Sequence, residues 1–413
     1  MSKSSSFREK HRDELKKIAT LYRDQLNHEI IPFWESRVLD ETWGGYHTFF
    51  TRQGVCNDFR KPGWFVGRTM YMFSAFYNQW EPKEKFLEIA HAGRRFLDGA
   101  FYAGNGRFNR MLSQNGEVLE GCTSIFTDHF AAKGLYEYIL ACGKESKAED
   151  VKLAKRLTQT LFENTCDPAI IAQVSPPGMQ SHGINFMNLQ IAQNSRQLFG
   201  DTYQTLVDEC VKRTLYQFVD DARQVTLENL GLDGKPIYEK EGRIIDPGHT
   251  VEALWFCMSE GSHANNKDYI RRAGQLLDWV INGAYDEKHG GFYHRYDVDG
   301  GPPKKEFDTV DYGPVQVSWN DKVWWVQCEA LLALCMSALL NENQRHYDYF
   351  LKQMAYTETH FRDRQYGEWY SVVAPDGSIL CDLKGFAGKG PYHVPRCLLQ
   401  LVKFIENYLD DKK

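Results

Sequence analysis

The chain has 413 residues, 42% of them hydrophobic and 25% charged, which is typical of a folded globular protein and excludes disordered or fibrous classes. The net charge of −6 offers no basic surface and argues against nucleic acid as the main partner. No run of about 18 apolar residues is long enough for a membrane span.

The ten cysteines are scattered along the chain without any CxxC spacing, and several lie in apolar helical contexts. This pattern is typical of reduced, mostly buried thiols in an intracellular protein. The first 17 residues are polar and lack the apolar core of a signal peptide. We therefore expect a cytoplasmic protein.

Helical periodicity dominates the chain and predicts a series of amphipathic or buried helices that arrive in pairs. There is no alternating βαβ pattern and no Pro/Ser-rich linker, which favours a single domain over residues 1–413. The expected helices are 8–36, 63–79, 84–103, 122–143, 147–165, 183–199, 202–219, 249–261, 266–284, 318–341, 345–362 and 392–409.

Short aromatic or β-branched runs that end in turn glycines recur between the helix pairs. Asp-Gly and Asn-Gly turns between such runs are the strongest short-range signal for a β-hairpin. The expected hairpins are 44–54, 106–116, 290–300 and 367–377.

Repeated units of two helices and a short hairpin predict a repeat-built, all-α architecture. Six helical hairpins can close into a ring with an inner and an outer layer, an (α/α)6 barrel, with the β-hairpins on one rim around a central pocket. An open helical solenoid is the alternative. About six pairs and a pocket-like set of polar residues favour the closed barrel.

The first candidate site residue in the chain is Arg68, in the otherwise apolar run Trp64–Tyr71. Burying an arginine alone is costly, so it must be paired or must reach a cavity. Arg68 is therefore a candidate for binding an anion or oxyanion. A structural salt bridge is the alternative.

His249 and Glu252 lie three residues apart at the start of a helix that Pro247 and Gly248 introduce, so they share a face. Histidine titrates near neutral pH, which suits a general base oriented by a carboxylate. A structural His–Glu hydrogen bond is the alternative. A metal site is disfavoured because no third ligand at helical spacing is visible.

Glu329 is a single carboxylate in the apolar helix that starts at Trp324 and Trp325. A buried carboxylate needs a partner, and we expect Arg68, Arg396 or a substrate hydroxyl. The two tryptophans are more often core residues than sugar platforms.

His393 and Arg396 are three residues apart around Pro395, at the start of the last apolar segment. Both are expected on one face of the start of a helix. The simpler interpretation is a polar helix start with an arginine that reaches solvent. The second helix start with a histidine, at His249, favours a functional pair.

Several segments resemble the N-acylglucosamine 2-epimerase family, also described as renin-binding proteins. The most specific are DPGHTVEALWF (246–256), YGEWYSVVAPDG (366–377) and KGPYHVPRCL (389–398). Gly67–Arg68, LENL (227–230) and WWVQCEAL (324–331) support the resemblance, which runs from about residue 10 to the end.

The resemblance implies an (α/α)6 barrel, usually a homodimer, that interconverts N-acetyl-D-glucosamine and N-acetyl-D-mannosamine. It places the two acid/base histidines on His249 and His393. It places supporting residues on Arg68, Glu252, Glu329 and Arg396. It implies ATP as an activator that is not consumed, although no segment is assigned to ATP. From the number of visible ligands, we expect no metal.

Two positions depart from the family pattern. Val326 stands where the family's tryptophan motif usually continues with proline. Related cellobiose 2-epimerases and mannose isomerases carry an extra histidine on a middle helix, where the best register here places Met187, with His182 nearby. Methionine fits the N-acylhexosamine branch better.

Inverting C2 of an aldose requires removing a proton next to a carbonyl and returning one to the opposite face. Two bases on opposite walls of a pocket suit this task, with positive charge from Arg68, and in a lesser role Arg396, at the developing oxyanion. Three alternatives remain: an aldose–ketose isomerase or cellobiose-type 2-epimerase, a glycoside hydrolase or lyase on the same scaffold, and a binding protein without activity.

Overall fold

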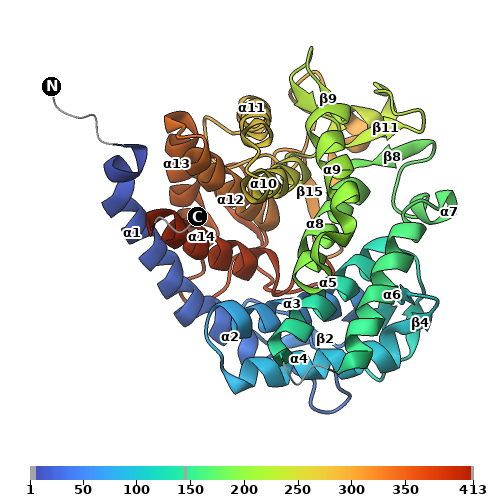
Figure 1. Ribbon diagram of the computed structural model, residues 1–413. Coiled ribbons are helices and arrows are strands. Elements are labelled where there is room, and N and C mark those ends of the chain that lie inside the picture. The colour runs from blue at the N-terminus through green and yellow to red at the C-terminus, as the bar shows by residue number, and fades with distance from the viewer. Residues whose placement is uncertain (1–5, 144–146, 411–413) are drawn as a thin grey trace.

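The computed structural model describes residues 6–143 and 147–410 and consists mainly of helices arranged in a ring of pairs (Figure 1). Each inner helix packs against the next inner helix along the chain and against one outer helix. The (α/α)6 barrel predicted from the sequence is confirmed. The inner helices are α3 (Gly63–Gln79), α5 (Ile125–Cys142), α8 (His182–Phe199), α10 (Pro247–His263), α12 (Trp324–Leu340) and α14 (His393–Leu409). The outer helices are α1 (Phe7–Gln25), α4 (Glu84–Phe96), α6 (Ala148–Asn164), α9 (Gln204–Lys212), α11 (Lys267–Ala284) and α13 (Gln344–His360).

The two layers differ in how their apolar residues are spaced. Helix α12 is apolar on nearly every side, and 16 of its 17 residues are buried, as expected for a helix enclosed by others. Helix α11 instead buries one stripe, including Ala273, Leu277 and Ile281, and exposes its charged side. This difference assigns α12 to the inner layer and α11 to the outer layer.

The first and last main helices form the sixth pair. Helix α1 packs along α14 (Figure 1). Arg23 on α1 forms an ion pair with Glu406 on α14. On the inside, the ring of Tyr392 lies 6.0 Å from that of Tyr71 on α3, which closes the inner layer. The helix pairs are therefore offset from chain order, with the N-terminal helix serving as the outer partner of the C-terminal one.

Short antiparallel strands connect the helices. Three predicted hairpins are found, although their strands are shifted by a few residues. These three are β1 (Phe49–Phe50) with β2 (Cys56–Asp58), β6 (Met111–Leu112) with β7 (Val118–Glu120), and β17 (Val372–Val373) with β18 (Ile379–Cys381). Strand β3 (Lys61–Pro62) also pairs with β6, and β16 (Lys322–Val323) with β17. A further hairpin joins β4 (Tyr102–Gly104) to β5 (Arg107–Phe108). The remaining pairs are β8 (Met179–Ser181) with β11 (Asn229–Gly231), β9 (Val219–Asp220) with β10 (Val225–Thr226), and β14 (Thr309–Asp311) with β15 (Gln316–Ser318).

Two predictions of local structure were wrong. The hairpin expected at 290–300 does not pair with itself, because β13 (Tyr296–Asp297) pairs with β12 (Ile244–Ile245) just before α10. The helix expected at 318–341 begins only at Trp324, because Lys322 and Val323 pair with β17. In both cases a partner far along the chain overrides the local pattern.

The buried apolar residues of the described part form one continuous core. The single domain over residues 1–413 stays a prediction, and its residues 1–5, 144–146 and 411–413 lie outside the described part. Within the described residues, no helix has both the length and the apolar character needed to cross a membrane.

Candidate active site

A cavity of about 330 Å³ lies where the inner helices begin. This volume falls at the low end of the roughly 300–1,000 Å³ typical of small-molecule sites. Its wall is largely aromatic, with a few ionisable groups. It is lined by Trp64, Arg68, Phe126, Phe130, Val174, Ser181, Gly183, Phe186, Met187, Glu228, His249, Glu252, Tyr312, Trp324, Trp325, Gly388 and His393.

His249 sits in the first turn of α10 and is held there by its helix start. Asp246 is the N-cap and accepts a hydrogen bond of 3.0 Å from the backbone N–H of His249, and Pro247 follows it. Gly248 allows Trp325 to approach, since a Cβ at this position would lie 2.4 Å from the indole ring. The indole and the imidazole lie 5.2 Å apart, centroid to centroid.

The carboxylate that orients His249 is Glu228 rather than Glu252. Nδ1 of His249 lies 3.1 Å from Oε1 of Glu228, and 3.7 Å from Oδ2 of Asp246. Burial alone would lower the pKa of His249, but Asp246 and Glu228 outweigh this effect and raise the pKa to about 10. His249 is therefore a cation at neutral pH. The expectation that Glu252 orients His249 was wrong, because Glu228 is the hydrogen-bond partner and Glu252 instead accepts from Arg396.

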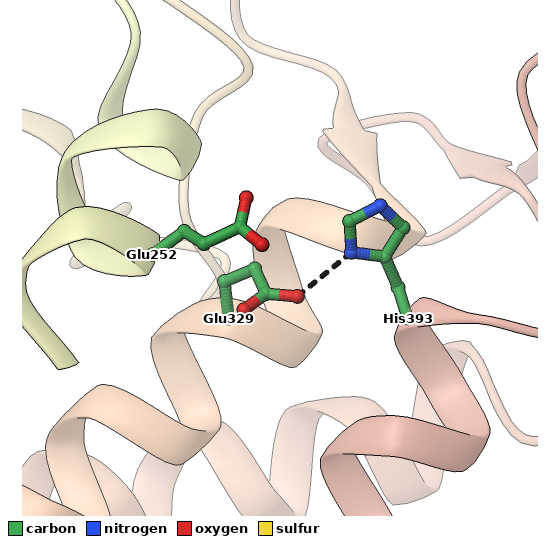
Figure 2. Close-up of side chains that lie close together, drawn as sticks. All are labelled: Glu252, Glu329 and His393. Carbon is green, nitrogen blue, oxygen red and sulfur yellow. Dashed lines mark hydrogen bonds and ion pairs between the residues drawn. The ribbon is translucent and has the colours of Figure 1, made fainter. Parts of the chain in front are cut away.

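His393 is the first residue of α14 and is only 9% exposed. Its Nδ1 lies 2.7 Å from Oε1 of Glu329 on α12 (Figure 2), so Nδ1–H donates and Nε2 is left with a lone pair. Burial lowers the pKa of His393 well below its ordinary value, and the positive charges of Arg68 and Arg396 lower it further. His393 is therefore neutral.

The two histidines are thus brought to the same cavity in opposite protonation states. Both rings pack against Trp325, with His249 at 5.2 Å and His393 at 5.8 Å between centroids. Environments that separate two pKa values in this way distinguish a proton donor from a proton acceptor. His249 can act as the acid and His393 as the base.

Arg68 lies on α3 in the cavity wall and is enclosed by aromatic rings. Its guanidinium carbon lies 3.9 Å from the ring centroid of Phe130 and 4.6 Å from that of Tyr392. Among the described residues it forms no ion pair, and its Nε has no hydrogen-bond partner. Burial lowers its pKa to about 10, so it stays charged. Arg68 fits the predicted anion-binding role rather than a structural salt bridge.

Arg396 holds the two remaining carboxylates together, one layer behind the cavity wall. Its Nη2 donates to Glu252 at 2.7 Å and to Glu329 at 2.5 Å, and its Nη1 donates to the hydroxyl of Tyr392 at 3.0 Å. The expected pairing of Glu329 with Arg396 is confirmed. Glu252 reaches the cavity, whereas Arg396 does not line it. Arg396 is therefore placed to position other groups rather than to touch a substrate.

Glu252, Glu329 and His393 also form a group that could hold a metal ion, with ligand atoms within 4.8 Å of one another (Figure 2). The guanidinium of Arg396 already bonds to both carboxylates, so an added cation would have to lie beside a fixed positive charge. This geometry fits a metal ion poorly. The absence of a metal stays a prediction.

Met187 and His182 lie in different environments. Met187 lines the cavity, as the predicted register requires. His182 is buried next to Phe218, lies 3.3 Å from the hydroxyl of Thr214, and has a pKa that burial lowers to about 3. His182 is a core residue.

Sequence reasoning missed three residues at the site. Glu228 lies within the LENL segment, but nothing local signals that it meets His249 21 residues later. Trp325 was assigned to the core, yet it contacts both histidines. The hydroxyl of Tyr392 accepts hydrogen bonds from Arg396 and, at 2.7 Å, from Lys133.

A sequence profile described as N-acylglucosamine 2-epimerase (GlcNAc 2-epimerase) matches residues 44–397. The chain belongs to the N-acylglucosamine 2-epimerase family. This assignment confirms the resemblance noted from the sequence motifs and makes the protein a carbohydrate epimerase, an isomerase.

Individual relatives agree with the assignment. The N-acylglucosamine 2-epimerase of Rattus norvegicus is 29% identical over 382 residues, covering 89% of this chain and 87% of the rat protein. The cellobiose 2-epimerase of Dictyoglomus turgidum is 25% identical over 422 residues, covering 95% and 100%. The structure of cellobiose 2-epimerase from Bacillus thermoamylovorans superimposes with a TM-score of 0.79 at 18% identity, covering 94% of this chain and 100% of the other, which supports the fold.

Proposed function

We propose that this protein interconverts N-acetyl-D-glucosamine and N-acetyl-D-mannosamine by moving a proton at C2. The observation that carries the proposal is the pair His249 and His393, which line one cavity, flank Trp325 and have pKa values shifted in opposite directions. Family membership and the rat relative support the substrate class.

In this mechanism the sugar opens to expose its aldehyde, and Nε2 of neutral His393 removes the C2 proton. Glu329 stabilises the imidazolium that forms, because it accepts the Nδ1–H. Cationic His249 then returns a proton to the opposite face of C2. Glu228 holds His249 in the orientation needed for this transfer.

Removing the C2 proton places negative charge on O1 of the enolate that forms. Arg68 supplies a preorganised positive charge in the cavity wall, with no protein carboxylate paired to it among the described residues. Electrostatic stabilisation of this kind is usually the largest single contribution to catalysis. Arg396 acts indirectly, by fixing Glu252 and Glu329.

A cellobiose-type 2-epimerase or an aldose–ketose isomerase is the second candidate, because both can use the same histidines. The cavity of about 330 Å³ favours a monosaccharide over a disaccharide. A glycoside hydrolase would need two carboxylates placed across the cleft. Here Arg396 binds Glu252 and Glu329, and Glu228 is engaged by His249, so this alternative is disfavoured.

Proton NMR in D2O tests the proposal. N-acetyl-D-mannosamine, mannose and cellobiose are incubated with the protein in parallel. We expect N-acetyl-D-glucosamine with deuterium at C2 from the first substrate. If N-acetyl-D-mannosamine does not react, fructose from mannose or a new epimer from cellobiose would favour the second candidate. No reaction of any of the three sugars would contradict both candidates.

The remaining expectations belong to the same proposal. No cofactor takes part in the proton transfers, and ATP acts as an activator that is not consumed. The protein is a cytoplasmic homodimer without a nucleic-acid partner. Adding ATP to the NMR assay tests the activation, sedimentation analysis tests the dimer, and fractionation of the source cells tests the location.

A further inference from the structure

A second cavity, of about 190 Å³, lies behind the first. The same inner helices line it one to two turns further along: α3 contributes Arg68 to the first cavity and Tyr71 to the second, and α14 contributes His393 and then Arg396. On α5, Lys133 lies in the second cavity. The side chains of Tyr392 and Arg396 lie between the two cavities.

Basic side chains outnumber carboxylates between the two cavities. Three buried basic side chains, Arg68, Lys133 and Arg396, lie near two buried carboxylates, Glu252 and Glu329. Both carboxylates bind Arg396. A buried charge without a counter-charge is costly. Arg68 faces the substrate cavity, where the enolate of the proposed reaction would form, so Lys133 is the basic group left without a counter-charge.

Other carboxylates near the second cavity are already engaged. Glu260 binds Arg196 at 3.0 Å and accepts from the side chain of Gln193 at 3.2 Å. Glu137, one turn beyond Lys133 on α5, accepts from Asn78 at 2.8 Å and from Gln79 at 3.1 Å. Neither forms an ion pair with Lys133 in the described part of the chain.

Hydrogen-bond donors next to the cavity are also left unused. Lys133 is 2% exposed, and its ammonium group, which has three donors, bonds to the hydroxyl of Tyr392 and to no other group among the described residues. Nε of Arg396 likewise has no partner there. Burial lowers the pKa of Lys133, and the charge of Arg396 lowers it further, so a nearby anion would favour the charged amine.

We propose that the second cavity binds a small inorganic anion, such as chloride, against Lys133 and Arg396. At about 190 Å³ the cavity can hold one halide and several waters, each of about 30 Å³. The amide side chain of Gln190 lines the same cavity and supplies a further polar contact. The anion balances Lys133 and, through Tyr392, fixes Arg396 and the carboxylates that it holds.

The test measures binding without reference to activity, so its outcome is independent of the proposed epimerase function. The protein is exchanged into gluconate buffer at constant ionic strength, and its Tm is followed as sodium bromide replaces gluconate. Crystals grown in bromide are examined for an anomalous scattering peak. We expect a saturable rise in Tm and a bromide peak beside Nζ of Lys133.

Two variants sharpen the test. Lys133→Met should lose the saturable rise in Tm, and Lys152→Met, at a lysine whose side chain is 73% exposed, should keep it. If Lys133→Met does not fold, the bromide peak in the unmodified protein decides. No peak in the second cavity, or a peak beside Arg68 alone, would overturn the proposal and indicate a neutral Lys133 in a water-filled cavity.

Discussion

Nδ1 of His393 lies 2.7 Å from Oε1 of Glu329, a residue 64 positions earlier in the chain and on a different helix. This hydrogen bond holds the proton of neutral His393 on Nδ1 and leaves Nε2 as the basic atom. The same carboxylate oxygen accepts from Arg396, which prevents it from rotating away.

Replacing Glu329 with glutamine should therefore impair catalysis more than folding. The amide keeps the shape of the side chain but loses the charge that stabilises protonated His393. We expect kcat to fall roughly 100- to 10,000-fold, with KM changing much less. Steady-state kinetics with Glu149→Gln as the control measure this, because the Glu149 side chain is 79% exposed. A kcat within a few-fold of the original protein would contradict the role of Glu329.

Removing one histidine should abolish epimerisation but leave exchange of the C2 proton by the other histidine. In His249→Asn, His393 can still exchange the C2 proton of one epimer with solvent. In His393→Asn, the remaining His249 is protonated at neutral pH, so it should exchange the C2 proton of the other epimer only as the pH approaches its pKa of about 10. Both variants should lose epimerisation by at least about 1,000-fold. Deuterium incorporation into each sugar, followed by NMR, measures the two activities separately. Full epimerisation in either variant would rule out two bases.

The pH profile should show a wide plateau, because the two histidines titrate far apart. Activity requires neutral His393, whose pKa lies well below its ordinary value, and protonated His249, whose pKa is about 10. The plot of kcat/KM should therefore decline on the basic side near pH 10, and on the acid side only well below the ordinary histidine pKa of about 6.5.

Glu228→Gln should move only the basic side of this profile. The substitution removes a charge and an ionic hydrogen bond that raise the pKa of His249, so kcat/KM should decline at a lower pH. The acid side reports His393 and serves as an internal control. A basic limb that stays in place would show that another group causes it.

Arg68→Met should separate activity from stability. The variant loses the positive charge near O1, and we expect kcat to fall roughly 100- to 1,000-fold. It also removes a buried cation without an ion-pair partner in the described structure, so the Tm should stay the same or rise. Kinetics and thermal unfolding of the same preparation measure both effects. A large drop in Tm would indicate a structural role for Arg68.

The periodicity of the sequence was enough to predict the helices, since even the buried α12 has the length and apolar content of an inner helix. The proline and glycine residues around the starts of α10 and α14 also allowed His249 and His393 to be placed correctly in the first turn of each helix. What local patterns could not supply is contact between distant segments. The partner of His249 is Glu228 on a connecting segment, and Glu252 instead meets Arg396 on α14, 144 residues later. The same limit explains β13, whose partner is β12.

The pairing of α1 with α14 has a consequence for the order in which the molecule becomes competent. Helix α1 precedes the other described helices in the chain, yet its main packing partner, α14, is the last of them to be synthesised. Helix α14 also carries His393 and Arg396, so a nascent chain can assemble five helix pairs and still lack the base proposed for catalysis. Closure of the ring and completion of the active site are therefore a single event, and a chain truncated before residue 393 would have neither.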